Sequence, residues 1–227
     1  MRYPGGKGKC YQHVINLMPP HRVYIETHLG GGSVLRHKRP AQKNIAVELD
    51  ADVVQAWQAN AAALELELVN GRAEDFLSAY SFEGDELAYV DPPYHPATRR
   101  RARVYAYDYT AVEHERLLEL LLGLPCKVML SGYRCPMYDH TLANWHRRDF
   151  QAKTHSGTRT ESLWLNFEPP SVLHDTRYLG EDFRQREVTR RRLSRLQDRL
   201  MRMSESERAA IARWLYERYP ETTRSLM

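Results

Sequence analysis

The chain has 227 residues, of which 42% are hydrophobic and 27% charged, and its net charge is +4. This length supports one sizeable domain with an appendage, and the mildly basic balance permits nucleic acid as a partner without requiring it. No apolar run approaches the roughly 18 residues that span a bilayer, and the amino terminus lacks the apolar stretch of a signal peptide. The 3 cysteines and 10 histidines show no disulfide or ligand spacing. We therefore expect a cytoplasmic protein with no membrane span, disulfide framework or metal site.

The first segments of the chain are rich in glycine. Residues 2–9 (RYPGGKGK) are also basic, and they precede an amphipathic pattern that predicts a helix over about 10–18. Residues 23–34 (VYIETHLGGGSV) then predict a strand, a glycine turn and the start of a helix. Glycines let the backbone approach a ligand closely, and helix N–H groups point toward it, as in nucleotide sites. For residues 2–9, a flexible amino terminus is the competing interpretation.

A second predicted strand, residues 44–50 (NIAVELD), ends in acidic residues. In nucleotide-binding sheets the second strand presents an acid to the ribose hydroxyls. Glu48 lies 16 residues after Gly32, close to the expected spacing. Asp50 fits better as the charge at the start of a helix predicted over 52–64. A third strand is predicted over 66–71.

The apolar run 86–90 (ELAYV) predicts a buried parallel strand, and Asp91-Pro92-Pro93-Tyr94 follows it directly. Ligands of α/β sheets bind just beyond the carboxyl ends of the strands. The prolines make this segment rigid and leave carbonyls without an adjacent donor. A carboxylate and a carbonyl that each accept one N–H bond of an aromatic amine would turn its lone pair toward an electrophile, with Tyr94 stacked on the ring. A Pro-Pro turn with a packing tyrosine is the competing interpretation.

Asp91-Pro92-Pro93-Tyr94 resembles the catalytic motif of amino-methyltransferases that use S-adenosylmethionine (SAM). Together with residues 3–7 (YPGGK), it is similar to the Dam-type adenine-N6 DNA methyltransferases, which include compact phage and prophage members. The resemblance covers about residues 1–168. It implies a Rossmann-like class I methyltransferase fold: an α/β, mostly parallel sheet closed by an antiparallel hairpin. It also implies site residues, which are Asp91, Pro92, Pro93 and Tyr94 for catalysis, and Tyr3, Lys7, Glu26, Gly30, Gly32, Ser33, Glu48 and Asp91 for the cofactor.

Two features depart from this family. Thr27-His28 stands where the family usually has Pro-Phe, which changes one wall of the expected pocket. Only about 60 residues separate the glycine turn from Asp91, so there is no room for the separate target-recognition domain of larger members. Residues 72–76 match the place where the family contacts the adenine of the cofactor, although the contacting side chain is left open.

The segment after Tyr94, residues 95–109, is rich in arginine and tyrosine. These residue types suit phosphate contact and base stacking, and a solvated basic loop is the competing interpretation. Another arginine lies at the tip of the closing hairpin, which is predicted from residues 151–156 and 161–167. We expect DNA contacts from Arg99, Arg101, Arg103, Tyr105 and Arg159.

Between these regions the chain predicts a helix and a buried strand. The helix covers residues 110–123, with Thr110 and Glu113 in capping-box spacing. The strand covers residues 126–133 and ends in small residues that we expect to line the pocket of the target base.

From residue 181 onward the character of the chain changes. Apolar residues recur at mostly helical spacing amid seven arginines between Arg184 and Arg199, and Ser204 and Glu207 cap a second helix over 205–219. We assign residues 1–175 to the methyltransferase domain and 176–227 to a basic helical extension. This extension packs on the domain, binds DNA phosphates or forms a homodimer; a solvated charged face is the plainest interpretation.

The sequence thus predicts a site-specific enzyme that flips adenine out of duplex DNA and methylates its N6 amino group from SAM. Asp rather than Ser at position 91 favours adenine over cytosine. The alternatives are an RNA adenine or cytosine-N4 methyltransferase and a DNA-binding module whose methyltransferase site is inactive. A nicotinamide dehydrogenase would explain the glycines at 30–32 and Glu48 but not residues 91–94.

Overall fold

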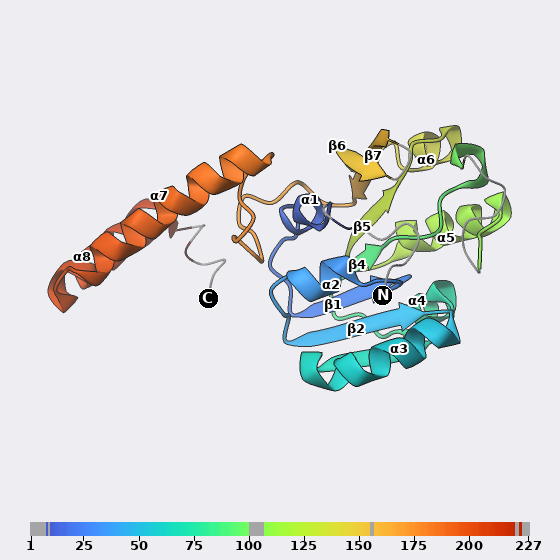
Figure 1. Ribbon diagram of the computed structural model, residues 1–227, viewed down its shortest axis with the longest axis horizontal. Coiled ribbons are helices and arrows are strands. Elements are labelled where there is room, and N and C mark those ends of the chain that lie inside the picture. Colours follow the sequence, from blue (N-terminus) through green and yellow to red (C-terminus); the bar gives the residue numbers. More distant parts are fainter. Residues whose placement is uncertain (1–7, 9, 100–106, 155–156, 221–222, 224–227) are drawn as a thin grey trace. The chain divides into compact units, whose positions relative to one another are not determined.

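The computed structural model describes residue 8 and residues 10–99, 107–154, 157–220 and 223 (Figure 1). The chain forms two units, one of residues 1–14 and 21–169 and the other of residues 15–20 and 170–227. The strands belong to the first unit, and the two long carboxyl-terminal helices belong to the second. Among the described residues, no helix has the length and apolar character needed to cross a membrane.

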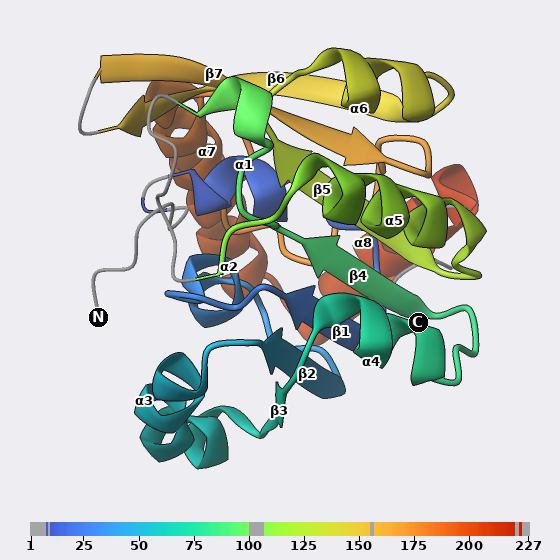
Figure 2. The same cartoon turned by 90° about the vertical axis from the view of Figure 1, so that its right-hand side faces the viewer.

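The first unit is built on a seven-stranded sheet with the strand order β3-β2-β1-β4-β5-β7-β6, which Figure 2 shows from β3 at the bottom to β6 and β7 at the top. Strands β1 to β5 run parallel to one another, whereas β7 pairs antiparallel with both β5 and β6. The strands are β1 (Val23–Thr27), β2 (Lys43–Glu48), β3 (Leu66–Asn70), β4 (Glu86–Val90), β5 (Lys127–Gly132), β6 (His146–Thr154) and β7 (Gly157–Leu165).

Most of the helices connect or cover these strands, and the last two helices belong to the second unit. The helices are α1 (Tyr11–Ile15), α2 (Ser33–His37), α3 (Ala51–Ala61), α4 (Ala73–Ala79), α5 (Ala111–Gly123), α6 (Pro136–Thr141), α7 (Phe183–Met201) and α8 (Glu205–Arg218), with short 3-10 helices η1 (Ala62–Leu64) and η2 (Pro96–Thr98). The parallel crossovers of helix and strand, closed by an antiparallel hairpin, confirm the predicted Rossmann-like methyltransferase fold.

The core lies where β1 sits between β2 and β4. Ile25 of β1 pairs in register with Ile45 of β2 and Ala88 of β4, and all three are fully buried. Leu117 and Leu121 of α5 belong to the same apolar cluster. Because helices cover a parallel sheet, its strands bury both of their faces and carry nearly continuous apolar runs. That is why residues 86–90 were recognisable as a strand.

Several predicted elements are confirmed, with two differences. Helix α5 begins at Ala111, and Thr110 caps it with both capping-box hydrogen bonds in place. The helix predicted over 10–18 is shorter, since α1 ends at Ile15 and two prolines follow at 19–20. Strand β6 begins at His146, five residues before the predicted start of the hairpin. The first residues of β6 are charged and so lack the apolar pattern that predicts a strand, because an edge strand exposes its side chains.

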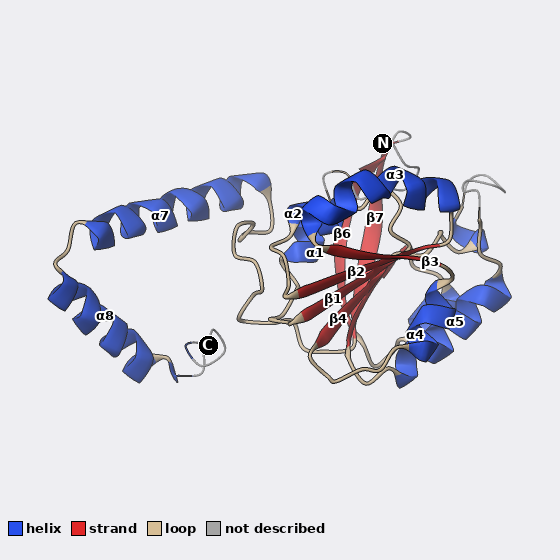
Figure 3. Ribbon diagram, turned by 90° about the horizontal axis from the view of Figure 1, so that it is seen from below, coloured by secondary structure: helices blue, strands red, loops and turns tan. Residues whose placement is uncertain are grey.

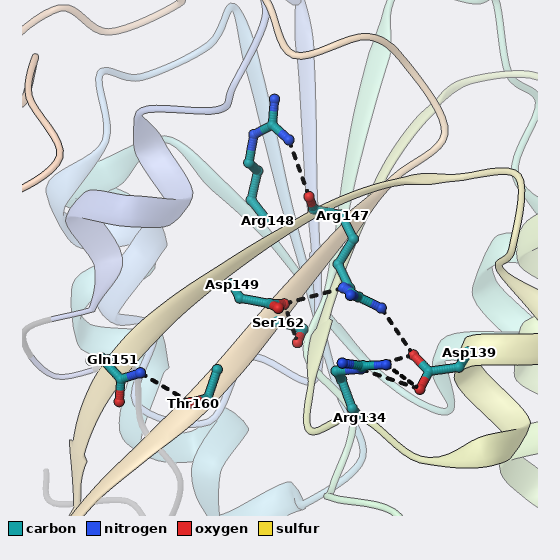
Figure 4. A network of polar contacts seen from close by, with 8 residues as sticks. All are labelled: Arg134, Asp139, Arg147, Arg148, Asp149, Gln151, Thr160 and Ser162. Carbon is teal, nitrogen blue, oxygen red and sulfur yellow. Dashed lines mark hydrogen bonds and ion pairs between the residues drawn. The ribbon is translucent and has the colours of Figure 1, made fainter.

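That outer strand carries a network of charged side chains shared with α6 (Figure 4). Arg147 contacts Asp139 of α6 at 3.2 Å and Asp149 of its own strand at 3.3 Å. Arg134 also pairs with Asp139, at 3.0 Å, and Ser162 of β7 donates to Asp149 at 2.7 Å. Charges along an edge strand discourage pairing with a further strand, so this network protects the end of the sheet.

The second unit contains α7 and α8, which follow one another in the chain (Figure 3). The Asp182 side chain accepts a hydrogen bond from Gln185 N and so caps α7. Ser204 and Glu207 form the predicted capping box of α8. Asn16 donates a hydrogen bond to the Gly180 carbonyl at 3.0 Å, which anchors the segment that leads into α7.

Candidate active site

The carboxyl ends of β1 and β4 are adjacent at the centre of the sheet. From β1 the chain moves outward to β2 and β3, and it then returns to place β4 on the other side of β1. This reversal leaves a crevice beyond the strand ends, where α/β sheets bind ligands. Glu26, near the end of β1, and Asp91, directly after β4, both line the cleft at this point.

Asp91 is held by a buried hydroxyl from the next strand. Ser131 of β5 is fully buried, and its Oγ donates a hydrogen bond of 2.6 Å to Asp91 Oδ1. The phenol of Tyr89 lies 3.2 Å from the same Oγ, so three side chains on neighbouring strands form one chain of contacts. The carboxylate therefore enters the cleft with its orientation set before any ligand arrives. Pro92 and Pro93 line the cleft beside it.

Glu26 is the second carboxyl group of the site, and it is only 3% exposed. Burial raises its pKa from 4.5 to about 7, and the charge of Asp91 acts in the same direction. A 2.8 Å hydrogen bond from Tyr24 and the charge of Lys38 oppose this rise without cancelling it. The cleft thus holds an acid that is close to half protonated at neutral pH.

The glycine turn at residues 30–32 is shaped by Trp57 of α3. Gly30 and Gly32 have φ angles of 47° and 55°, which favour glycine. Trp57 Nε1 donates to the Gly30 carbonyl at 2.9 Å, and a Cβ on Gly32 would lie 2.3 Å from the indole ring. The turn therefore has no space for a side chain at position 32, and its backbone forms one wall of the cleft.

Glu48, at the end of β2, joins the glycine turn to the next loop. Its Oε2 accepts from Gly30 N at 2.7 Å and its Oε1 accepts from Asp50 N at 3.0 Å. Burial raises the pKa of this carboxyl, and the two backbone donors partly offset the rise. The side chain of Asp50 accepts from Asp52 N and caps α3. The cap at α3 confirms the role that the sequence predicted for Asp50, whereas the predicted contact of Glu48 with a ribose stays a prediction.

One cleft brings most of the predicted site residues together. It holds about 780 Å³ of empty space, counting its open mouth. Among the described residues, no group of histidine, cysteine and acidic side chains is arranged to hold a metal ion. The predicted residues that line the cleft are Glu26, Gly30, Gly32, Ser33, Glu48, Asp91, Pro92 and Pro93.

The wall at Thr27-His28 is polar. His28 adopts a left-handed φ of 59°, and its ring lies 3.0 Å from Thr27 Oγ1 and 2.9 Å from the Tyr109 hydroxyl. Burial lowers the pKa of His28 to about 3, so the imidazole is neutral at physiological pH. Tyr109 also lines the cleft. A neutral, hydrogen-bonded imidazole therefore takes the place of the phenylalanine that is usual in the resembling family.

Tyr94 lies beside another tyrosine. Its ring centroid is 4.2 Å from that of Tyr133, at an interplanar angle of 35°, and the guanidinium of Arg159 lies 3.8 Å from the Tyr133 ring. Arg159 also donates to the Thr98 carbonyl at 3.0 Å. Tyr94 is thus part of an aromatic group next to the cleft, and Arg159 supports that group from the hairpin.

Arg99 has a different role from the DNA contact that we expected. Its side chain is 4% exposed, and it pairs with Asp108 at 2.8 Å. It also donates to the carbonyls of Tyr94 and Tyr109, so the guanidinium ties together both ends of the segment after the Asp-Pro-Pro-Tyr motif. A buried, fully engaged guanidinium does not reach a phosphate, which corrects this assignment. The predicted roles of Tyr3, Lys7, Arg101, Arg103 and Tyr105 lie outside the described residues.

Sequence reasoning placed Ser131 among the small residues expected to line the target-base pocket but missed its hydrogen bond to Asp91, and it missed Trp57. Ser131 ends a strand that is adjacent to β4, so its place on the same edge of the sheet was the available signal. For Trp57 there was none, because its contact with the glycine turn joins residues 27 positions apart.

No family model and no curated protein matches the sequence. Solved structures do match the fold. The 23S rRNA methyltransferase ErmE is 13% identical with a TM-score of 0.50, over 74% of this chain and 71% of that chain. PH1948 from Pyrococcus horikoshii, which is provisionally classed with RNA methyltransferases, is 13% identical with a TM-score of 0.50, over 71% and 85% of the two chains. SMU.1697c from Streptococcus mutans, a methyltransferase candidate in complex with SAH, is 11% identical with a TM-score of 0.48, over 73% and 98%. The chain therefore has the fold of Rossmann-like methyltransferases.

Proposed function

We propose that this chain is a SAM-dependent methyltransferase that acts on the N6 amino group of adenine in DNA. The placement of Asp91 carries the proposal. Its carboxylate is oriented by the buried Ser131 at the rim of a cleft that Pro92 and Pro93 also line. A rigid set of acceptors in such a cleft suits an exocyclic amine, which donates two hydrogen bonds and has a lone pair to expose.

The residues of the cleft fit SAM in three ways. Glu48, at the end of β2, lines the cleft, and its carboxylate oxygens, which each accept one backbone N–H, keep further lone pairs that suit the ribose hydroxyls. The glycine turn lines the cleft at residues 30–32 with backbone alone, so no side chain stands between it and a bound cofactor. The carboxyl of Glu26, when ionised, complements the positive charge of the methionine end. When bound, SAM supplies an activated methyl group.

The chain's own residues would orient the base. Asp91 and the Pro92 carbonyl each accept one N–H bond of the amine, which brings the nitrogen toward tetrahedral geometry, and Tyr94 stacks on the adenine ring. Held in this way, the nitrogen would accept the methyl group that bound SAM supplies, and the surplus amine proton, held by Asp91 or the Pro92 carbonyl, would then leave to solvent. Extraction of the base from the duplex costs a few kcal/mol, and positioning of the reactants supplies most of the rate enhancement.

DNA is the proposed substrate because residues 91–94 and 3–7 together resemble the Dam-type enzymes. RNA is the second candidate, since two of the solved structures with this fold are named with RNA methyltransferases. An inactive site that only binds nucleic acid is the third. These three candidates differ in the product that they form.

The test is methyl transfer from labelled SAM to duplex DNA, single-stranded DNA and RNA, followed by identification of the modified nucleoside by mass spectrometry. We expect N6-methyldeoxyadenosine from DNA. Asp91→Ala should abolish transfer while calorimetry still detects SAM binding, and full activity of that variant would refute the role of Asp91. Label confined to RNA, or to cytosine, would overturn the substrate, and SAM binding without any transfer would indicate an inactive site.

A further inference from the structure

Helix α7 has a row of arginines along one side. At 3.6 residues per turn, Arg184, Arg191, Arg192, Arg195 and Arg199 fall within an arc of about 100° around the helix axis. The two acids of α7, at positions 187 and 198, lie together at one border of this arc. Its three leucines, at positions 193, 196 and 200, lie outside the arc on the other side. The helix thus presents one strongly basic face.

Four of these arginines are not engaged within the protein. Among the residues that the structure describes, Arg184, Arg192, Arg195 and Arg199 are exposed, and their side chains form no hydrogen bond or ion pair. Other arginine side chains of α7 do form ion pairs or hydrogen bonds within the protein. Arg190 and Arg191 pair with Glu187 at 2.9 and 3.7 Å, and Arg186 donates to two backbone carbonyls before the helix.

The residue type indicates the kind of partner. Residues 170–227 contain 13 arginines and no lysine, and α7 alone has seven arginines against two acids. Lysine would serve equally well on a face that only needs to be soluble. Arginine has a planar guanidinium that donates two parallel hydrogen bonds to a phosphate, and it is less strongly hydrated than an ammonium group.

We infer that this basic face, formed by Arg184, Arg192, Arg195 and Arg199, binds the phosphate backbone of nucleic acid. From Arg184 to Arg199 the helix rises about 22 Å, comparable to the rise of six base pairs of duplex. Contacts of this kind provide affinity and orientation without sequence selectivity. The inference rests on the proposed function only in choosing nucleic acid as the partner, and it assigns the face a role that does not need a separate recognition domain.

The test uses the full chain and two triple variants that remove equal charge. R192Q/R195Q/R199Q removes three arginines of the basic face, whereas R208Q/R213Q/R218Q removes three that are distributed around α8. Glutamine and arginine have similar helix propensities, so circular dichroism should show unchanged helix content in both. Binding to a fluorescent duplex is measured by anisotropy over a range of salt concentrations without SAM.

We expect the basic-face variant to flatten the slope of log K against log salt by about 2 to 3, since each phosphate contact contributes about 0.9. Its affinity at low salt should fall at least tenfold. The α8 variant should change the slope by less than about 1. Equal effects of the two variants, or no change in slope, would overturn the inference.

Two further measurements separate competing partners. Binding of the wild-type chain to phosphatidylserine vesicles, but not to DNA, with the same dependence on these arginines would show that the face serves a membrane surface. Concentration-dependent self-association that only R192Q/R195Q/R199Q abolishes would show a contact between copies. Asp91→Ala is included in the binding series because it separates the two hypotheses. If the wild-type chain binds DNA through the basic face but transfers no methyl group, the proposed function is refuted and this inference stands. If R192Q/R195Q/R199Q binds DNA as the wild type does and methyl transfer occurs, this inference is refuted and the proposed function stands.

Discussion

Ionisation of Glu26 should set the pH dependence of stability of the ligand-free protein. The folded chain holds its proton more tightly than the unfolded chain does, since burial and the neighbouring Asp91 raise the pKa from 4.5 to about 7. The contribution of Glu26 is therefore fully present below pH 4.5 and is lost as pH rises to about 7. At about 1.4 kcal/mol for each tenfold change in proton affinity, this loss amounts to about 3 kcal/mol.

Glu26→Gln removes the ionisation and keeps an oxygen that can accept from Tyr24. At pH 4.5 the variant and the wild type should have nearly equal free energies of unfolding, and at pH 8 the variant should be more stable by about 3 kcal/mol. Urea unfolding of both proteins between pH 4.5 and pH 8 measures the difference in their free energies of unfolding. The contributions of the other titrating groups are the same in both proteins and cancel in this difference. Glu115→Gln, on the exposed surface of α5, controls for the loss of one charge. A difference that does not vary with pH, or a less stable Glu26→Gln at pH 8, would refute the reasoning.

The same carboxyl links stability to the proposed cofactor. A cationic ligand beside Glu26 favours the ionised form, so the affinity for SAM should increase as pH rises through 7. This increase should be absent in Glu26→Gln. Calorimetric titration with SAM at pH 6 and pH 8 would show whether it occurs.

Three further substitutions test the packing of the site. Gly32→Ala should lower the free energy of unfolding by more than about 2 kcal/mol, because its Cβ would lie 2.3 Å from an indole carbon at a φ of +55°. The control Gly71→Ala has nothing within 4 Å of its Cβ and should lower it by less than about 1 kcal/mol, as urea unfolding measures. Ser131→Ala should lower the rate of methyl transfer about 10- to 100-fold with SAM binding retained, since Asp91 loses the 2.6 Å hydrogen bond that orients it; full activity would contradict this role. Arg99→Gln should cost about 3 to 5 kcal/mol, because it breaks an ion pair whose guanidinium is 4% exposed. An unchanged unfolding midpoint would contradict that assignment.

Local sequence was sufficient for the frame of the site. Asp91 and the glycine turn at 30–32 each follow a strand, and Glu48 ends one; the hydrophobic pattern of these strands is visible without tertiary information. Parallel strands end at one edge of the sheet, so their order in the chain was enough to predict that these residues share a cleft. The boundaries of α5 and the two capping boxes were equally local, because a cap involves residues three positions apart.

Only the tertiary structure decided which side chains remain available. Arg99 is one of four arginines between residues 99 and 103, and nothing in that run indicates that it is buried against Asp108. Ser131 contacts Asp91 across 40 positions, and Trp57 limits space at Gly32 from another helix. A sequence pattern describes what a side chain can do, whereas burial and distant partners determine whether its hydrogen bonds and charge are already used within the fold.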